Sequence, residues 1–102
     1  MKQANQHITL PGDEALLILH ELEYLLISLR NIGTHYHTMP GATTDDYRTE
    51  TTNFIDHHHV TARLATMRRL ITEKFDVEPG ADDMDDIERN QQDLRPWQKP
   101  GD

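Results

Sequence analysis

Histidine is the residue type with the most evident chemistry in this chain. There are seven histidines in 102 residues, and His57, His58 and His59 are consecutive. If the chain doubles back near residue 40, position 57 lies beside Glu23 and position 59 lies beside Glu21. Imidazole and carboxylate groups on facing helices are a common ligand set for transition metals. The sequence therefore suggests a metal site formed by His57, His58, Glu21 and Glu23. The alternative is a hydrogen-bonded, partly buried His57 with the other histidines at the surface.

A second group of reactive side chains is Arg30, Asn31 and His35. Their order resembles the R-N-x-x-x-H signature of HEPN domains, which are helical, commonly dimeric proteins, many of which cleave RNA without a metal. The resemblance covers the end of one helix and implies that Arg30 stabilises phosphate and that His35 is an acid or base, with Asn31 in support. The structural alternative is a salt bridge from Arg30 to Glu50 and an ordinary helix end at Gly33 and His35.

Acidic side chains crowd the segment between residues 82 and 93. The segment lacks the glycine and the alternating spacing of a calcium-binding loop. Acidic runs are usually solvated. The functional alternative is a tail that docks on a basic protein partner through Asp82 and Asp86, with Trp97 as an aromatic anchor.

Two long helices must position these groups. The first is expected over residues 13–35, with Asp13 as its cap and Gly33 as its stop. Its apolar side chains recur at spacings of three and four residues and also spread to the flanks and the back, so most sides of this helix need to be covered. The second helix is expected over residues 44–75, capped by Thr43 or Thr44, with a weaker apolar stripe.

The sequence therefore predicts an all-α fold. We expect a long antiparallel helical hairpin over residues 11–76, which dimerises into a four-helix bundle. Residues 1–10 form a flexible lead-in, and residues 77–102 form an acidic, partly disordered tail with a short helix. The expected oligomer interface consists of Ile18, Leu22, Leu25, Leu29, Ile32, Leu64, Met67 and Ile71.

Composition narrows the functional classes. The chain has no cysteine, which excludes disulfides and thiolate metal sites and is consistent with the cytoplasm. Its formal net charge of −8 disfavours nucleic-acid binding, except as RNA substrate of a HEPN-like enzyme, and is compatible with a basic protein partner. The apolar run of the first helix is interrupted by charges and is short for a membrane span.

The favoured hypothesis is a small acidic module that acts by binding, through self-association and a protein partner. Plausible roles are an immunity or antitoxin-like inhibitor, a phage or mobile-element factor, and an assembly chaperone. The alternatives are a HEPN-like ribonuclease or toxin–antitoxin component and, third, a metal-binding helical bundle. The binding hypothesis needs no cofactor, whereas the third needs a transition metal.

Overall fold

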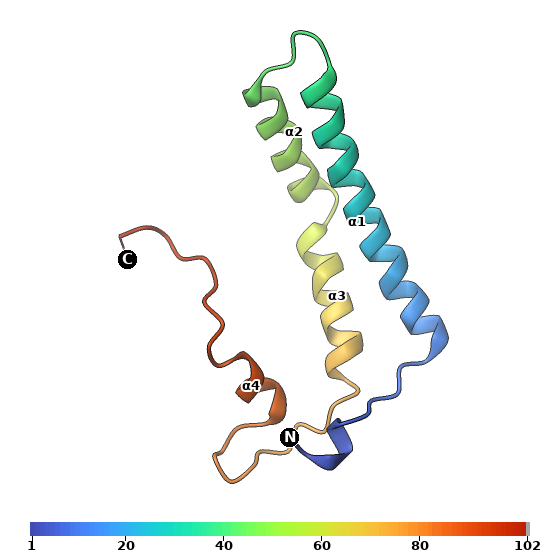
Figure 1. Ribbon diagram of the computed structural model, residues 1–102, viewed down its shortest axis with the longest axis vertical. Helices are drawn as coiled ribbons and strands as arrows, with labels where there is room; N and C mark the ends of the chain where they lie inside the picture. Colours follow the sequence, from blue (N-terminus) through green and yellow to red (C-terminus); the bar gives the residue numbers. More distant parts are fainter. Residues whose placement is uncertain (102) are drawn as a thin grey trace. The chain divides into compact units, whose positions relative to one another are not determined.

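The computed structural model of the protein describes residues 1–101. Over this range the ordered elements are all helical, and there is no strand (Figure 1). In chain order they are a 3-10 turn at Gln3–Asn5, α1 at Gly12–Thr38, α2 at Thr44–His57, α3 at Val60–Thr72 and α4 at Asp86–Gln91. The predicted all-α class is confirmed.

The chain divides into two compact units. Leu10–Ile71 form the first, which we call the helical unit. Met1–Thr9 join the residues from Thr72 onward in the second, the terminal unit. In the predicted division the lead-in and the tail were separate segments, whereas here they belong to one unit. Asp102, the last residue of the predicted tail, lies outside the described residues.

The start and the end of α1 differ from the prediction. Asp13 does not cap the helix; the N-cap position is Pro11, and the carboxylate of Asp13 instead accepts a hydrogen bond from the next backbone N–H at 3.0 Å. Gly33 does not end the helix but lies within it. The helix ends at Thr38, and its C-cap residue Met39 has an extended backbone because the proline ring of Pro40 disfavours the helical conformation in the preceding residue.

The predicted second helix is interrupted, so residues 44–75 form two helices and not one. α2 begins with a capping box: the hydroxyl of Thr43 accepts a hydrogen bond from the backbone N–H of Asp46 at 3.0 Å, and the carboxylate of Asp46 accepts one from the backbone N–H of Thr43 at 2.9 Å. The interruption comes at His59, whose φ of 57° lies in the left-handed region. Histidine tolerates this region better than most residues, and the helical hydrogen-bond pattern cannot continue through it.

His58 makes the contacts that accompany this break. Its ring stacks on Phe54 with 5.3 Å between the ring centroids, and its Nδ1 lies 3.1 Å from the hydroxyl of Tyr24 on α1. Its carbonyl oxygen accepts a hydrogen bond from Nε of Arg63 at 3.0 Å. The break therefore ties the α2–α3 junction to the middle of α1.

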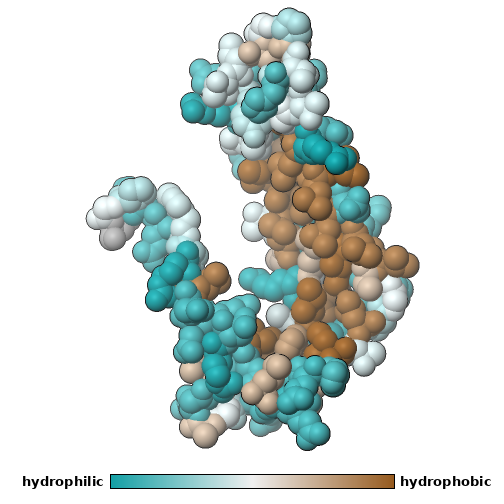
Figure 2. Space-filling view, in the orientation of Figure 1, coloured by the Kyte–Doolittle hydropathy of each residue, from teal (hydrophilic) through white to brown (hydrophobic). Residues whose placement is uncertain are grey.

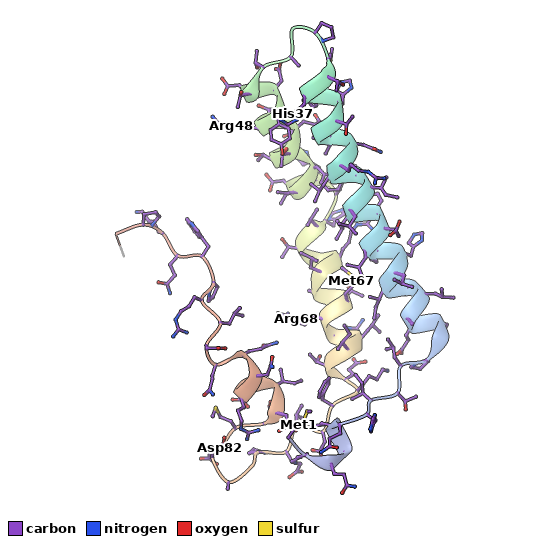
Figure 3. The ribbon with its side chains drawn as sticks, in the orientation of Figure 1. Met1, His37, Arg48, Met67, Arg68 and Asp82 are labelled. Atoms are coloured by element: carbon purple, nitrogen blue, oxygen red, sulfur yellow. The ribbon has the colours of Figure 1, made fainter. Side chains whose placement is uncertain are left out.

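Within the helical unit, α2 and α3 run back along α1 in the opposite direction (Figure 1). A small core forms between them, and Figure 3 shows one of its members, Met67, on the side of α3 that faces α1. The core residues are Ile18, Leu25, Phe54, Met67 and Leu70. No described side chain is completely buried, so α2 and α3 leave much of the apolar surface of α1 uncovered.

Candidate functional site

Nine large apolar side chains remain exposed along α1 and α3. Six of them lie on one side, and we call these six the apolar face. They are Leu19, Leu22, Leu26 and Leu29 of α1 with Leu64 and Ile71 of α3. Each is between 39% and 62% exposed. Figure 2 shows apolar side chains gathered over these two helices. A contiguous apolar surface of this kind marks an interaction site in most proteins.

Helical geometry places all six on the same side of the helical unit. Each residue along an α-helix is rotated by about 100° about the helix axis. By this measure the four leucines of α1 are rotated by about 20–100° from the core residue Ile18, all in the same sense. On α3, Leu64 and Ile71 lie about 40–60° from the core residue Met67 in the same sense. Because the two helices run in opposite directions, equal rotation on each leads to the same side. The apolar face is therefore continuous across both helices.

The predicted oligomer interface is thus divided between two surfaces. Ile18, Leu25 and Met67 lie in the core, and the half-buried Ile32 packs against it. Leu22, Leu29, Leu64 and Ile71 are exposed. The division arises because α2 and α3 cover only one edge of the broad α1 stripe. Leu19 and Leu26, on the flank of this stripe, complete the exposed edge.

The predicted metal ligands are not brought together. Glu21 accepts a hydrogen bond from the guanidinium of Arg63 at 2.6 Å, and His58 is turned toward the tyrosine of α1. Glu23 and His57 are exposed. Over residues 1–101, no three histidine, aspartate or glutamate side chains are placed to hold an ion. The predicted geometry fails because it assumed one continuous helix through residues 57–59.

The HEPN-like residues are brought together only in part. Asn31 and His35 line a shallow pocket with Tyr36, and Glu50 contributes a carboxylate to the same pocket. Arg30 is not among the lining residues. Five residues along a helix correspond to a rotation of about 140°, so Arg30 and His35 point to different sides of α1. The expected salt bridge between Arg30 and Glu50 is not formed among the described residues.

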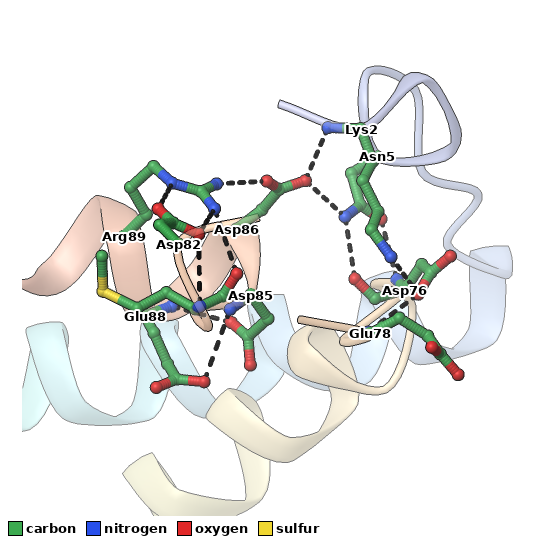
Figure 4. A network of polar contacts seen from close by, with 10 residues as sticks. Lys2, Asn5, Asp76, Glu78, Asp82, Asp85, Asp86, Glu88 and Arg89 are labelled. Carbon is green, nitrogen blue, oxygen red and sulfur yellow. Dashed lines mark hydrogen bonds and ion pairs between the residues drawn. The ribbon is translucent and has the colours of Figure 1, made fainter. Parts of the chain in front are cut away.

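The terminal unit is organised around Asn5, which is only 4% exposed (Figure 4). Its side-chain amide donates to the carbonyl oxygen of Asp76 at 2.9 Å and to the carboxylate of Asp86 at 2.7 Å. Its side-chain oxygen accepts from the backbone N–H of Asp76 at 2.8 Å. Asp86 also accepts from the backbone N–H of Lys2 at 2.8 Å. The N-terminal segment is thereby bound to the segment after α3 and to α4.

Asp82 and Asp86, the predicted partner-binding acids, are engaged within the terminal unit. Arg89 donates two hydrogen bonds to Asp82 and one to Asp86, each at 2.7 Å. The Arg89 guanidinium holds the pKa of the Asp82 carboxyl well below its usual value. The hydrogen bond from Asn5, together with that from the backbone of Lys2, lowers the pKa of Asp86. These two acids therefore bind other parts of this chain, which corrects the expectation that both are free to bind a partner.

Asn5 and Arg89 belong to no motif that marks them as important in the sequence. The sequence did carry one local signal, since Asp85 and Glu88 form a capping box that marks the start of α4. No local signal points to Asn5, because its partners lie 71 and 81 residues further along the chain.

Comparison of the chain with protein-family models, with curated proteins and with solved structures finds no match. Among the helices of residues 1–101, none combines the length and the apolar character that a membrane crossing requires.

Proposed function

We propose that this protein acts by binding, as a small helical module that self-associates through the apolar face. Two helical hairpins pack face to face into a four-helix bundle, and the assembled acidic surface then recruits a protein partner. The observation that carries this proposal is the exposure of six large apolar side chains on one side of α1 and α3. Burial of such surface is the main driving force of protein association.

The thin core of the helical unit supports the same proposal. Small chains with little buried apolar surface commonly need a staple or an oligomer to be stable. This chain has no cysteine to form a disulfide staple. A second copy on the apolar face supplies the missing burial.

The partner proposed for the assembled module is a basic protein, since the chain carries a net charge of −8. Trp97 is 82% exposed and is the aromatic anchor that we propose for this contact. Asp83 and Asp93 are exposed acids of the same segment. They, and not Asp82 and Asp86, are the carboxylates that we propose for contact with the basic partner. An immunity-like inhibitor, a mobile-element factor or an assembly chaperone would each use such a surface.

Self-association is tested by the mass of the untagged protein in solution, measured by light scattering and by native mass spectrometry. We expect a dimer, and we expect Leu22→Glu to convert it to a monomer because the substitution places a charge within the buried face. Leu17→Glu is the matched control: Leu17 is 44% exposed against 39% for Leu22, but lies about 140° away on α1. A monomeric wild type, or equal effects of the two substitutions, contradicts the proposal.

The HEPN-like ribonuclease is the alternative, and one observation favours it: Asn31 and His35 share a pocket. The position of Arg30 outside that pocket and the carboxylate of Glu50 inside it reduce the support, because a phosphate needs positive charge. RNA cleavage by the wild type that His35→Ala abolishes, with helical circular dichroism unchanged, would favour this alternative over the binding module.

A further inference from the structure

We propose that the shallow pocket between α1 and α2 binds an arginine side chain of the basic protein partner. Its lining residues are Asn31, Ile32, His35, Tyr36 and Glu50, and its volume is about 300 Å³, which is the size of a small ligand pocket. The inference rests on the proposed function, in which the partner is basic, and adds where one of the partner's charges is bound. It follows from the charge of the pocket, its aromatic wall and its place on the helical unit.

Glu50 gives the pocket its negative charge. Its side chain is half-buried, and it forms no ion pair among the described residues. Within residues 1–101, no lysine or arginine lines the pocket, and Arg30, the expected partner of Glu50, lies outside it. A half-buried carboxylate is screened less by water and salt than one at the open surface. Glu50 is therefore available to a cation that enters the pocket from outside.

The aromatic wall of the pocket favours a guanidinium group over other cations. The rings of His35 and Tyr36 meet edge to face, with 4.8 Å between their centroids and 85° between their planes. A guanidinium is planar and weakly hydrated, so it stacks on a ring while its N–H groups donate to a carboxylate. The side-chain oxygen of Asn31 is a further hydrogen-bond acceptor. The ammonium group of lysine has no planar fork and should bind more weakly.

The pocket lies away from the apolar face. Asn31 and His35 are rotated by about 140° and 100° from Ile18, in the sense opposite to that of the exposed leucines of α1. They therefore lie on the side of α1 that is closer to α2 and Glu50. Two copies that pack through the apolar face leave this pocket open, so each copy of the assembled module presents one arginine site.

An NMR titration of the isotope-labelled full chain with Nα-acetyl-arginine amide tests the inference. We expect the backbone amide signals of Asn31, His35 and Glu50 to shift together and to saturate, with a dissociation constant of about 1–10 mM. The citrulline derivative has nearly the same shape without the charge, and it should not saturate these shifts. The lysine derivative should bind several-fold more weakly than the arginine derivative.

Two variants of α2 separate the pocket from the net charge. Glu50→Gln keeps the size of the side chain and removes its charge, so it should weaken binding of the arginine derivative about tenfold. Asp56→Asn is the matched control, because it removes the same charge from an exposed position of α2 and should change binding by less than about twofold. Equal losses in the two variants would mean that the net charge alone attracts the ligand, which overturns the inference.

The outcomes also separate this inference from self-association, which is measured by the mass in solution. A dimer whose pocket signals do not respond to the arginine derivative, or respond equally to the lysine derivative, overturns the arginine site alone. A monomer that binds the arginine derivative in this pocket overturns self-association alone. Inorganic phosphate and zinc chloride are the counter-probes. Shifts of the pocket signals by one of these in place of the arginine derivative overturn the inference, in favour of the HEPN-like alternative or of a metal site respectively.

Discussion

Asn5 shows how much of the terminal unit depends on single polar residues. Within residues 1–101, the terminal unit contributes none of the buried apolar core residues, and hydrogen bonds and ion pairs around Asn5, Asp86 and Arg89 join its segments. A buried amide with all its partners satisfied stabilises one conformation, whereas loss of one partner leaves another group unpaired. The carboxylates in this network should therefore control its stability.

We expect the terminal unit to lose stability in acid. The pKa values of Asp82 and Asp86 are lowered in the folded unit, chiefly by Arg89 and by Asn5 respectively. A lowered carboxyl pKa contributes stability that is present above the unfolded value, about 3.9, and is lost as pH falls through the folded value. Carboxyl carbon NMR titration should give midpoints for both acids below the ordinary value.

Arg89→Gln identifies the cause of this behaviour. It should raise the midpoint of Asp82 toward the ordinary value and raise the pH at which the terminal unit begins to open. Arg95→Gln is the control, because Arg95 is exposed and its only hydrogen bond among the described residues is to the carbonyl oxygen of Leu94. An unchanged Asp82 midpoint in Arg89→Gln would refute the assignment.

At the scale of the elements, the break between α2 and α3 decides which side chains meet α1. It sets His58 against Tyr24 and Phe54, and it lets Arg63 reach Glu21. The side of the helical unit opposite the apolar face is thereby occupied by polar contacts. Arg63 also lies over the ring of Tyr24, with 4.3 Å from Cζ to the ring centroid.

Because His59 has a positive φ, we expect glycine to have opposite effects on stability at His59 and at His57. His59→Gly should stabilise the helical unit by up to about 1 kcal/mol, because glycine adopts positive φ without the penalty of a Cβ atom. His57→Gly, the same change within α2, should destabilise it by about 0.5–1 kcal/mol. Urea unfolding followed by circular dichroism measures both. Destabilisation of similar size at both positions would mean that the break at His59 is not formed.

At the scale of the whole molecule, the apolar face and the net charge of −8 have opposite effects on self-association. Like charges keep copies apart at long range, while the apolar face favours their association at contact.

Thermal stability should therefore depend on protein concentration. For a dimer, a tenfold rise in concentration is equivalent to about 1.4 kcal/mol, which raises the Tm of a domain of this size by roughly 5 °C. Scanning calorimetry of the wild type from micromolar to near-millimolar concentration measures this shift. Leu22→Glu should show a Tm that is lower and independent of concentration, and a concentration-independent wild type would argue against self-association.

The sequence by itself determined the features that depend on neighbouring residues. The helical class follows from the three-and-four spacing of leucines in residues 15–32, and the start of α2 follows from the threonine and aspartates at residues 43–46. The excess of apolar side chains on α1 is also evident from the sequence, because the helical period alone shows that they surround most of the helix.

Only the tertiary structure decided how that excess is divided. Ile18 and Leu25 lie in the core while Leu22 and Leu29, on the same predicted stripe, are exposed. The division depends on where α2 and α3 lie, and that placement depends on a left-handed His59 and on contacts between distant residues. The structural role of Asn5 cannot be predicted from the sequence for the same reason. A hydrogen bond between residues 81 positions apart produces no periodic pattern in the sequence. Local patterns determine the elements, whereas the pairing of their faces is a property of the folded chain.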